Sequence, residues 1–306
     1  MSKIRTQSFA LEEAYPFLRA FGNVSFKTND GKSLYAIKGQ RNPALLYDNE
    51  LEESMPFLRL TPGICSSWAF WPAEEDLPYA VTDRCSCCCN RESDNCSKKA
   101  CLISSSKNRQ RVLRPNIVLL GANWSTSAQG GDIYASGNHL AWSDYHTALK
   151  MVEGDRMFSD LLHTTSFEGA YMTDFIKGFI DGDLGSVIKF MKEDGVFLQF
   201  FEILRNELTE LNKTFGISHD IDKVMIVWGP SLMNALVYCA KKNKRKLAEL
   251  LPGYSWKMFG AHYSKQARRR RNKPPLNYQE HLAKMQMITD YSTDMIQLST
   301  DDIHNY

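Results

Sequence analysis

Several side chains suited to binding and hydrolysis lie in short polar stretches of this sequence. Asn123, Asp174 and His262 each follow an apolar run. An amide or an imidazole can orient water or stabilise charge, whereas an ionised carboxylate only accepts hydrogen bonds. Trp142 follows a glycine-rich stretch at 128–138, where it would either stack on a flat ligand or belong to the core. Which interpretation holds depends on the elements that position these residues.

From residue 112 onward, apolar runs alternate with helical patterns, which is typical of a parallel sheet covered by helices on both faces. We expect an α/β, three-layer fold with a central, mostly parallel four-stranded sheet. The expected strands are 116–121, 169–174, 223–229 and 256–262, and the expected helices are 154–165, 196–212, 230–242 and 276–288.

Polar residues follow all four expected strands, in the stretches "GANWS", "TD", "WGPS" and "AHYS". The carboxyl ends of parallel strands meet at one edge of a sheet, and ligands bind in the crevice beyond that edge. The sequence therefore predicts a site at this edge.

The N-terminal part has a different pattern, and we expect two domains. Residues 1–105 are predicted to form an irregular N-terminal lobe, with a hairpin around Asn-Asp-Gly at 29–31 and a cysteine-rich segment. The polar stretch near residue 106 would mark the boundary, and residues 106–306 would form the core domain.

Six of the eight cysteines cluster in the segment "CSCCCNRESDNCSKKAC". In a reducing compartment such a cluster favours a metal site or free thiols over disulfides. Its spacing is not that of two CxxC pairs, so a structural zinc, an iron–sulfur cluster and the absence of metal all stay open. The cysteines concerned are Cys85, Cys87, Cys88, Cys89, Cys96 and Cys101.

The formal net charge of +2 identifies no partner, but the charge is unevenly distributed. Residues 265–273 read "KQARRRRNK", a basic run that would be either a solvated loop or a phosphate-binding segment. No apolar stretch reaches the roughly 18 residues of a membrane span. The N-terminal residues lack the apolar core of a secretion signal, so we expect a cytoplasmic protein.

Residues from about 112 to 290 resemble the uracil-DNA glycosylase superfamily in the order and spacing of five short motifs. The family has an apolar strand ending in Gly-x-Asp-Pro-Tyr or Gly-x-Asn-Pro-Gly, then "GLAFS", "GVLLLN", "LLWG" and His-Pro-Ser. The corresponding stretches here are "LLGANWS", "HLAWS", "GAYMTD", "MIVWG" and "AHYS". The resemblance implies an enzyme that takes a base out of the DNA stack and hydrolyses its bond to deoxyribose, with no cofactor for catalysis.

The resemblance also implies a role for individual residues. Trp142 would stack on the flipped base, Asn123 would orient the attacking water, and His262 would stabilise charge on the departing base. A carboxylate from Asp132 or Asp144 could lie nearby. Ser264 would hold a phosphate, and a basic run would follow the DNA backbone; its members are Lys265, Arg268, Arg269, Arg270 and Arg271.

Three departures from the family pattern bear on the substrate. Trp124 stands where proline is usual, which changes the loop after the first strand. Asp174 stands where the uracil enzymes have asparagine, and a carboxylate suits the exocyclic amine of cytosine but repels O4 of uracil. Ser125 stands where the uracil-specific branch has a tyrosine that blocks groups on carbon 5 of the ring. A cytosine modified at carbon 5, such as the glucosylated hydroxymethylcytosine of bacteriophage DNA, fits the changes at Asp174 and Ser125. The chain resembles an anti-phage DNA glycosylase of that type.

Alternatives stay open at each level. Asn123 could be a turn residue, Asp174 an N-cap or a salt-bridged strand end, and His262 a structural residue. The chain could instead be a repair glycosylase for uracil or another deaminated base, in which a protonated Asp174 donates to O4. It could also be an inactive nucleic-acid-binding module with the same fold.

Overall fold

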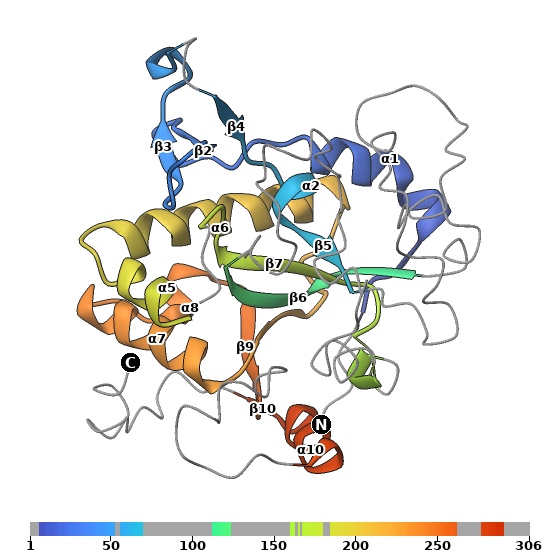
Figure 1. Ribbon diagram of the computed structural model, residues 1–306. Coiled ribbons are helices and arrows are strands. Elements are labelled where there is room, and N and C mark those ends of the chain that lie inside the picture. Colours follow the sequence, from blue (N-terminus) through green and yellow to red (C-terminus); the bar gives the residue numbers. More distant parts are fainter. Residues whose placement is uncertain are drawn as a thin grey trace.

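The structure of the chain is a computed structural model (Figure 1). It describes residues 6–52, 56–69, 112–123, 160–162, 165, 167–179, 184–261 and 277–290.

Four mutually parallel strands form the centre of the main sheet, in the order β7-β6-β8-β9. They are β6 (Val112–Asn123), β7 (Ala170–Ile176), β8 (Lys223–Val227) and β9 (Tyr254–Phe259). All seven residues of β7 are buried, as expected of a strand covered on both faces. The prediction of an α/β fold with a mostly parallel central sheet is confirmed.

β6 begins earlier than the sequence indicated, because the strand continues through Pro115. Proline has no N–H to donate to a strand ladder, so it is confined to edges and irregularities. The pairing of β6 with β7 shifts register between Arg114 and Val118, which accommodates Pro115. Beyond this point the ladder is regular up to Asn123, which pairs with Ile176.

Three short antiparallel strands extend the sheet. β1 (Phe9–Ala10) pairs with the start of β6, β5 (Ser67–Trp68) pairs with β7, and β10 (Ile288–Asp290) pairs with β9. Strands of two or three residues are too short for a period-two pattern to reveal them in the sequence. They make the described sheet seven-stranded rather than four-stranded.

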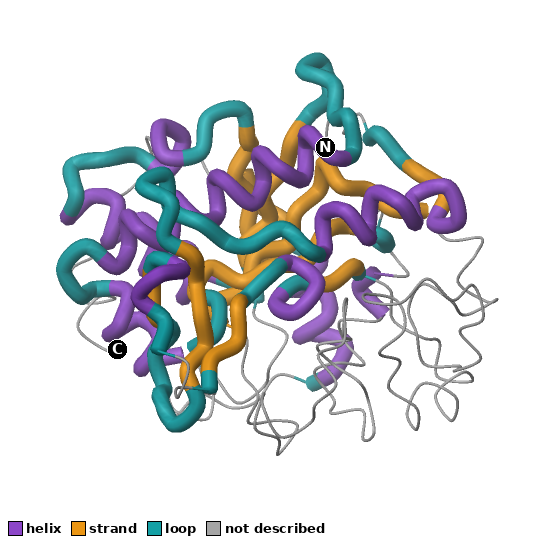
Figure 2. The backbone as a smooth tube through the Cα atoms, turned by 90° about the horizontal axis from the view of Figure 1, so that it is seen from above, coloured by secondary structure: helices purple, strands orange, loops and turns teal. Residues whose placement is uncertain are grey.

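Helices pack against the parallel strands (Figure 2). One face carries the larger apolar cluster, which includes Val118 and Leu120 of β6 together with Phe201 and Leu204. The helices that contribute to it are α1 (Leu11–Gly22), α2 (Pro62–Cys65), α5 (Leu184–Met191), α6 (Val196–Thr214), α7 (Pro230–Lys242) and α8 (Leu247–Leu250).

The other face carries a smaller cluster that contains Ile117 and Leu119 of β6. Leu161, Phe167 and the helix α10 (Tyr278–Gln286) pack there. The predicted helices at 196–212, 230–242 and 276–288 are confirmed as α6, α7 and α10. Residues 160–162 are helical within the expected helix at 154–165, most of which lies outside the described residues.

A second, three-stranded antiparallel sheet has the order β3-β2-β4. Its strands are β2 (Ser33–Ile37), β3 (Ala44–Leu46) and β4 (Phe57–Arg59), and a short 3-10 helix, η1 (Asp48–Glu50), follows β3. The expected turn precedes β2. There, Thr28 N–H donates to the Lys32 carbonyl at 3.0 Å, and Gly31 has a φ of 91°.

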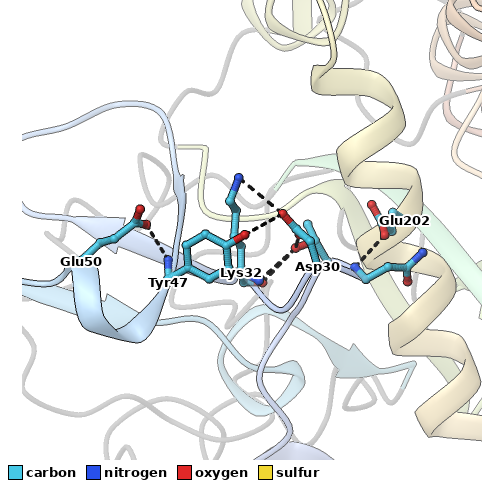
Figure 3. Close-up of polar contacts among 7 residues, drawn as sticks. Asp30, Lys32, Tyr47, Glu50 and Glu202 are labelled. Carbon is cyan, nitrogen blue, oxygen red and sulfur yellow. Dashed lines mark hydrogen bonds and ion pairs between the residues drawn. The ribbon is translucent and has the colours of Figure 1, made fainter.

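Polar contacts hold this turn together and attach it to α6 (Figure 3). Asp30 accepts hydrogen bonds from the Thr28 hydroxyl and, at 3.2 Å, from the Tyr47 hydroxyl, and it forms an ion pair with Lys32. The bond from Thr28 is the main reason why the pKa of Asp30 is below its usual value. The Asn29 N–H donates to Glu202 of α6 at 2.6 Å.

The predicted domain boundary near residue 106 lies between 70 and 111, outside the described residues. Of the segments before it, β1 and β5 belong to the main sheet, and α1 and α2 contribute to its larger apolar cluster. The three-stranded sheet is separate in its hydrogen bonding. The division into two domains, the N-terminal lobe and the number of layers stay predictions.

Gly169, just before β7, tests the pairing of β6 with β7. It has a φ of 79°, and a Cβ there would lie 1.9 Å from the carbonyl oxygen of Val112. We expect Gly169→Ala to lower the free energy of unfolding by about 3 kcal/mol or more, since backbone strain and a steric clash add. Urea unfolding measures this.

Gly216→Ala is the matched control, because Gly216 also has a positive φ, of 57°, but a Cβ there meets nothing within 4 Å. Strain alone should cost about 1 kcal/mol. Equal losses for the two variants would contradict the close approach of Gly169 to β6.

Candidate functional site

The carboxyl ends of the four parallel strands lie at one edge of the sheet. Asp174 of β7 pairs with Gly121 of β6, and Leu120 pairs with Val227 of β8. Val227 in turn pairs with Met258 of β9, so Trp228 and Phe259 follow one position later. Alternation along the strands then places four residues in one row on the face of the smaller cluster: Asp174, Gly121, Trp228 and Phe259.

Asp174 approaches β6 closely because Gly121 has no side chain. An ideal Cβ at Gly121 would lie 2.0 Å from Oδ1 of Asp174 and 3.6 Å from Cε3 of Trp228. The carboxylate therefore lies against the backbone of β6, with the indole of Trp228 beside it. Asp174 is only 7% exposed, an unusual position for an acidic residue.

Trp228 begins the loop between β8 and α7. The backbone N–H of Trp228 donates to the Leu120 carbonyl at 3.0 Å, and this bond holds the loop against β6. Gly229, with a φ of 95°, then turns the chain, and Pro230 opens α7. The side chain of Trp228 is half-buried against the smaller cluster.

This loop lies where the strand order changes direction. The chain goes from β6 to β7 on one side and from β8 to β9 on the other, so β6 and β8 flank the switch point. In sheets of this kind the binding crevice opens beyond the carboxyl ends at that point. A carboxylate and an aromatic ring side by side there can bind a flat molecule that carries a hydrogen-bond donor.

Trp228 lies in the stretch "WGPS", which was expected at this edge, but it was not among the predicted site residues. An aromatic residue directly after a buried strand, followed by Gly-Pro, was the available signal. What the sequence could not give was the sheet register that brings Trp228 next to Asp174.

The structure describes only two of the predicted site residues. Asp174 lies within β7, two residues before the strand ends at Ile176 rather than at the end of the strand as expected, and Asn123 is the last residue of β6, at the carboxyl edge. β9 also ends at this edge, at Phe259. The predicted convergence of these residues with the others stays a prediction, since the following lie outside the described residues: Trp124, Ser125, Asp132, Trp142, Asp144, His262, Ser264, Lys265, Arg268, Arg269, Arg270 and Arg271.

The predicted metal cluster, which runs from Cys85 to Cys101, also lies outside the described residues. Within them, no group of three or more His, Cys, Asp or Glu side chains could hold a metal ion. The described cysteines are Cys65 and Cys239, both buried and free. Burial raises the pKa of the Cys65 thiol far above its usual value and that of Cys239 to about 11, so both are poor nucleophiles and ligands.

Comparison of the chain with protein-family models, with curated proteins and with solved structures finds no match in any of the three. In the part of the chain that the structure describes, no helix is both long and apolar enough to cross a membrane.

The contact between Gly121 and Asp174 can be tested by a double-mutant cycle. We expect Gly121→Ala to destabilise the protein by about 1–3 kcal/mol, because the new methyl group takes the place of the carboxylate. In the background of Asp174→Ala the same change should cost much less, giving a coupling of about 0.5–3 kcal/mol. Thermal or urea unfolding of the four proteins measures it, and additive effects would place the carboxylate elsewhere.

Proposed function

We propose that this protein is a DNA glycosylase that flips a base into the crevice at the carboxyl edge and hydrolyses its N-glycosidic bond, leaving an abasic site. The observation that carries the proposal is the buried carboxylate of Asp174, beside Trp228 at the switch point of the sheet. The order of the five glycosylase-like motifs along the chain supports it independently.

The proposed reaction is a substitution at the sugar carbon. The bond from the base nitrogen to C1′ breaks, and the base leaves with the bonding electrons. Water oriented by Asn123 attacks C1′, which is strongly electrophilic once the sugar resembles an oxocarbenium ion, and the proton that the water releases neutralises the departing base anion. His262 stabilises the charge that develops on the carbonyl oxygen of the base, and Trp142 replaces the stacking that the base loses, worth about 1–3 kcal/mol.

The proposed substrate is a cytosine modified at carbon 5, such as glucosylated hydroxymethylcytosine in phage DNA. An ionised Asp174 accepts a hydrogen bond from the exocyclic amine of cytosine and repels O4 of uracil. Ser125 in place of a bulky residue leaves room beside carbon 5. A preference for the modified base would also spare the unmodified cytosines of the host, consistent with a cytoplasmic antiviral role.

The substitution Asp174→Asn tests how the base is read. We expect activity on 5-modified cytosine to fall by about 10- to 100-fold, because a match of this kind is worth about 1–3 kcal/mol. Relative activity on uracil should rise, since the amide can donate to O4. The measurement is single-turnover excision from oligonucleotides that carry uracil, cytosine, hydroxymethylcytosine or glucosylated hydroxymethylcytosine, followed by alkaline cleavage.

The same panel separates the alternatives. A wild-type protein that prefers uracil or another deaminated base would be a repair glycosylase. One that binds these oligonucleotides but cleaves none would be an inactive nucleic-acid-binding module. An unchanged preference in the Asp174→Asn variant would show that this residue does not read the base.

The basic run from Lys265 to Arg271 is proposed to bind phosphate without reading sequence. Replacing Arg268 and Arg269 by alanine should weaken binding to all the oligonucleotides alike. The slope of log K against log salt should fall by about one unit for each lost contact. Fluorescence anisotropy at several salt concentrations measures this, and an unchanged slope would mean that the run does not touch DNA.

A further inference from the structure

A fully buried ion pair lies next to β7, the strand that contains Asp174. Lys177, just after β7, places its Nζ 2.8 Å from Oε2 of Glu207 on α6, and both side chains are 0% exposed. The desolvation cost of such a pair is high, so it contributes little to stability compared with apolar residues of the same size.

Glu207 holds several elements together through its other carboxylate oxygen. Oε1 accepts hydrogen bonds from the hydroxyl groups of Tyr171 at 2.6 Å, Thr173 at 2.8 Å and Ser66 at 3.2 Å. Three donors on Oε1 and the ammonium group beside Oε2 hold the buried carboxylate in place. Burial and the nearby carboxylate also raise the pKa of Tyr171, which keeps it a neutral donor.

Lys177 extends this network to the candidate site. Its Nζ also donates to the backbone carbonyl of Asp174 at 2.7 Å, and it lies 4.9 Å from the centre of the Phe26 ring. Tyr171 and Thr173 face Glu207, so alternation along β7 places the carboxylate of Asp174 on the opposite face. The peptide of Asp174 is thus held from one face of the sheet while its side chain lies on the other.

We propose that Lys177 and Glu207 are positioning residues that fix the orientation of the Asp174 carboxylate. β6 pairs with β7 up to Ile176, but β5 pairs with β7 only at Tyr171 and Met172, so β5 does not reach Asp174. The Lys177 ammonium group adds a bond to the Asp174 carbonyl, which a neutral, apolar pair cannot supply. The effect on base selection rests on the proposed function, but the restraint on the backbone does not.

The test is the double variant Lys177→Met/Glu207→Gln, which removes both charges together and leaves no uncompensated buried charge. The amide that replaces the Glu207 carboxylate can still accept from Tyr171 and Thr173, but the bond from the Lys177 ammonium group to the Asp174 carbonyl is lost. We expect amide hydrogen exchange in residues 174–178 to become at least about tenfold faster. The preference for 5-modified cytosine over uracil should fall about 10- to 100-fold through kcat, with DNA affinity within about twofold of wild type.

One further single variant and one control accompany the double variant. Glu207→Gln leaves the Lys177 ammonium group buried without its counter-ion, so it should unfold at a lower temperature than wild type and show faster exchange across residues 174–178. Lys242→Met removes a lysine from an exposed ion pair with Asp194, at 3.3 Å, and should change neither exchange nor preference.

The outcomes separate the two proposals. A folded double variant with wild-type exchange across 174–178 overturns the positioning role, whatever its activity. Faster exchange with a wild-type base preference limits the pair to the backbone and overturns its effect on selection. If the wild-type protein excises no base, the proposed function fails, and exchange alone decides the positioning role. If the double variant does not fold, hydrogen exchange of the wild-type protein provides the test. The amides of residues 174–178 should exchange as slowly as those of 170–173. Exchange more than tenfold faster than in 170–173 would contradict the restraint.

Discussion

The pairing of β6 with parallel neighbours on both sides is the constraint on which the rest of the structure depends. β7 and β8 run parallel to β6, and β9 runs parallel to β8, so all four strands end at the same edge. Because strands lie about 4.8 Å apart, the residues at the carboxyl ends of β6, β7, β8 and β9 are brought within a few strand spacings of one another. The proximity of Asn123, Asp174 and Trp228 therefore depends on this pairing.

The two faces of the sheet differ in the groups that surround Asp174. On one face, α6 supplies Glu207 to a buried network that ends on the backbone of Asp174. On the other face, the carboxylate of Asp174 occupies the space left open by Gly121 and lies beside Trp228. A charged group that is held in this way loses little freedom when it binds a ligand, which favours selective recognition.

Much of the core domain could be predicted from the sequence, because its long elements have strong patterns. The apolar run at 223–227 and the amphipathic pattern of α6 lie close to their predicted bounds. The limits of β6 were less accurate, because the apolar run at 116–121 covers only part of a strand that extends from Val112 to Asn123. The short strands β1, β5 and β10 were missed because their pairing depends on tertiary contacts rather than on local pattern.

The candidate site could be predicted only in part, for a related reason. The sequence predicts that the strand ends at Asp174, whereas β7 continues to Ile176, and the contact of Asp174 with Gly121 depends on which strands pair and in what register. One signal was available and not used: Glu207 lies on the buried stripe of α6, between Leu204 and Leu211. A carboxylate on such a stripe requires a buried partner, and Lys177, directly after a buried strand, is that partner.

The central claim is that Asp174 contacts the exocyclic amine of a base flipped into the crevice at the carboxyl edge. A crystal structure of the protein with an oligonucleotide that carries 5-modified cytosine tests it most directly, with a non-cleavable sugar to trap the complex. The account predicts the amine nitrogen within about 2.7–3.2 Å of an Asp174 carboxylate oxygen, with the modified carbon 5 directed away from Gly121. A base bound elsewhere, or DNA at the opposite edge of the sheet, would contradict it.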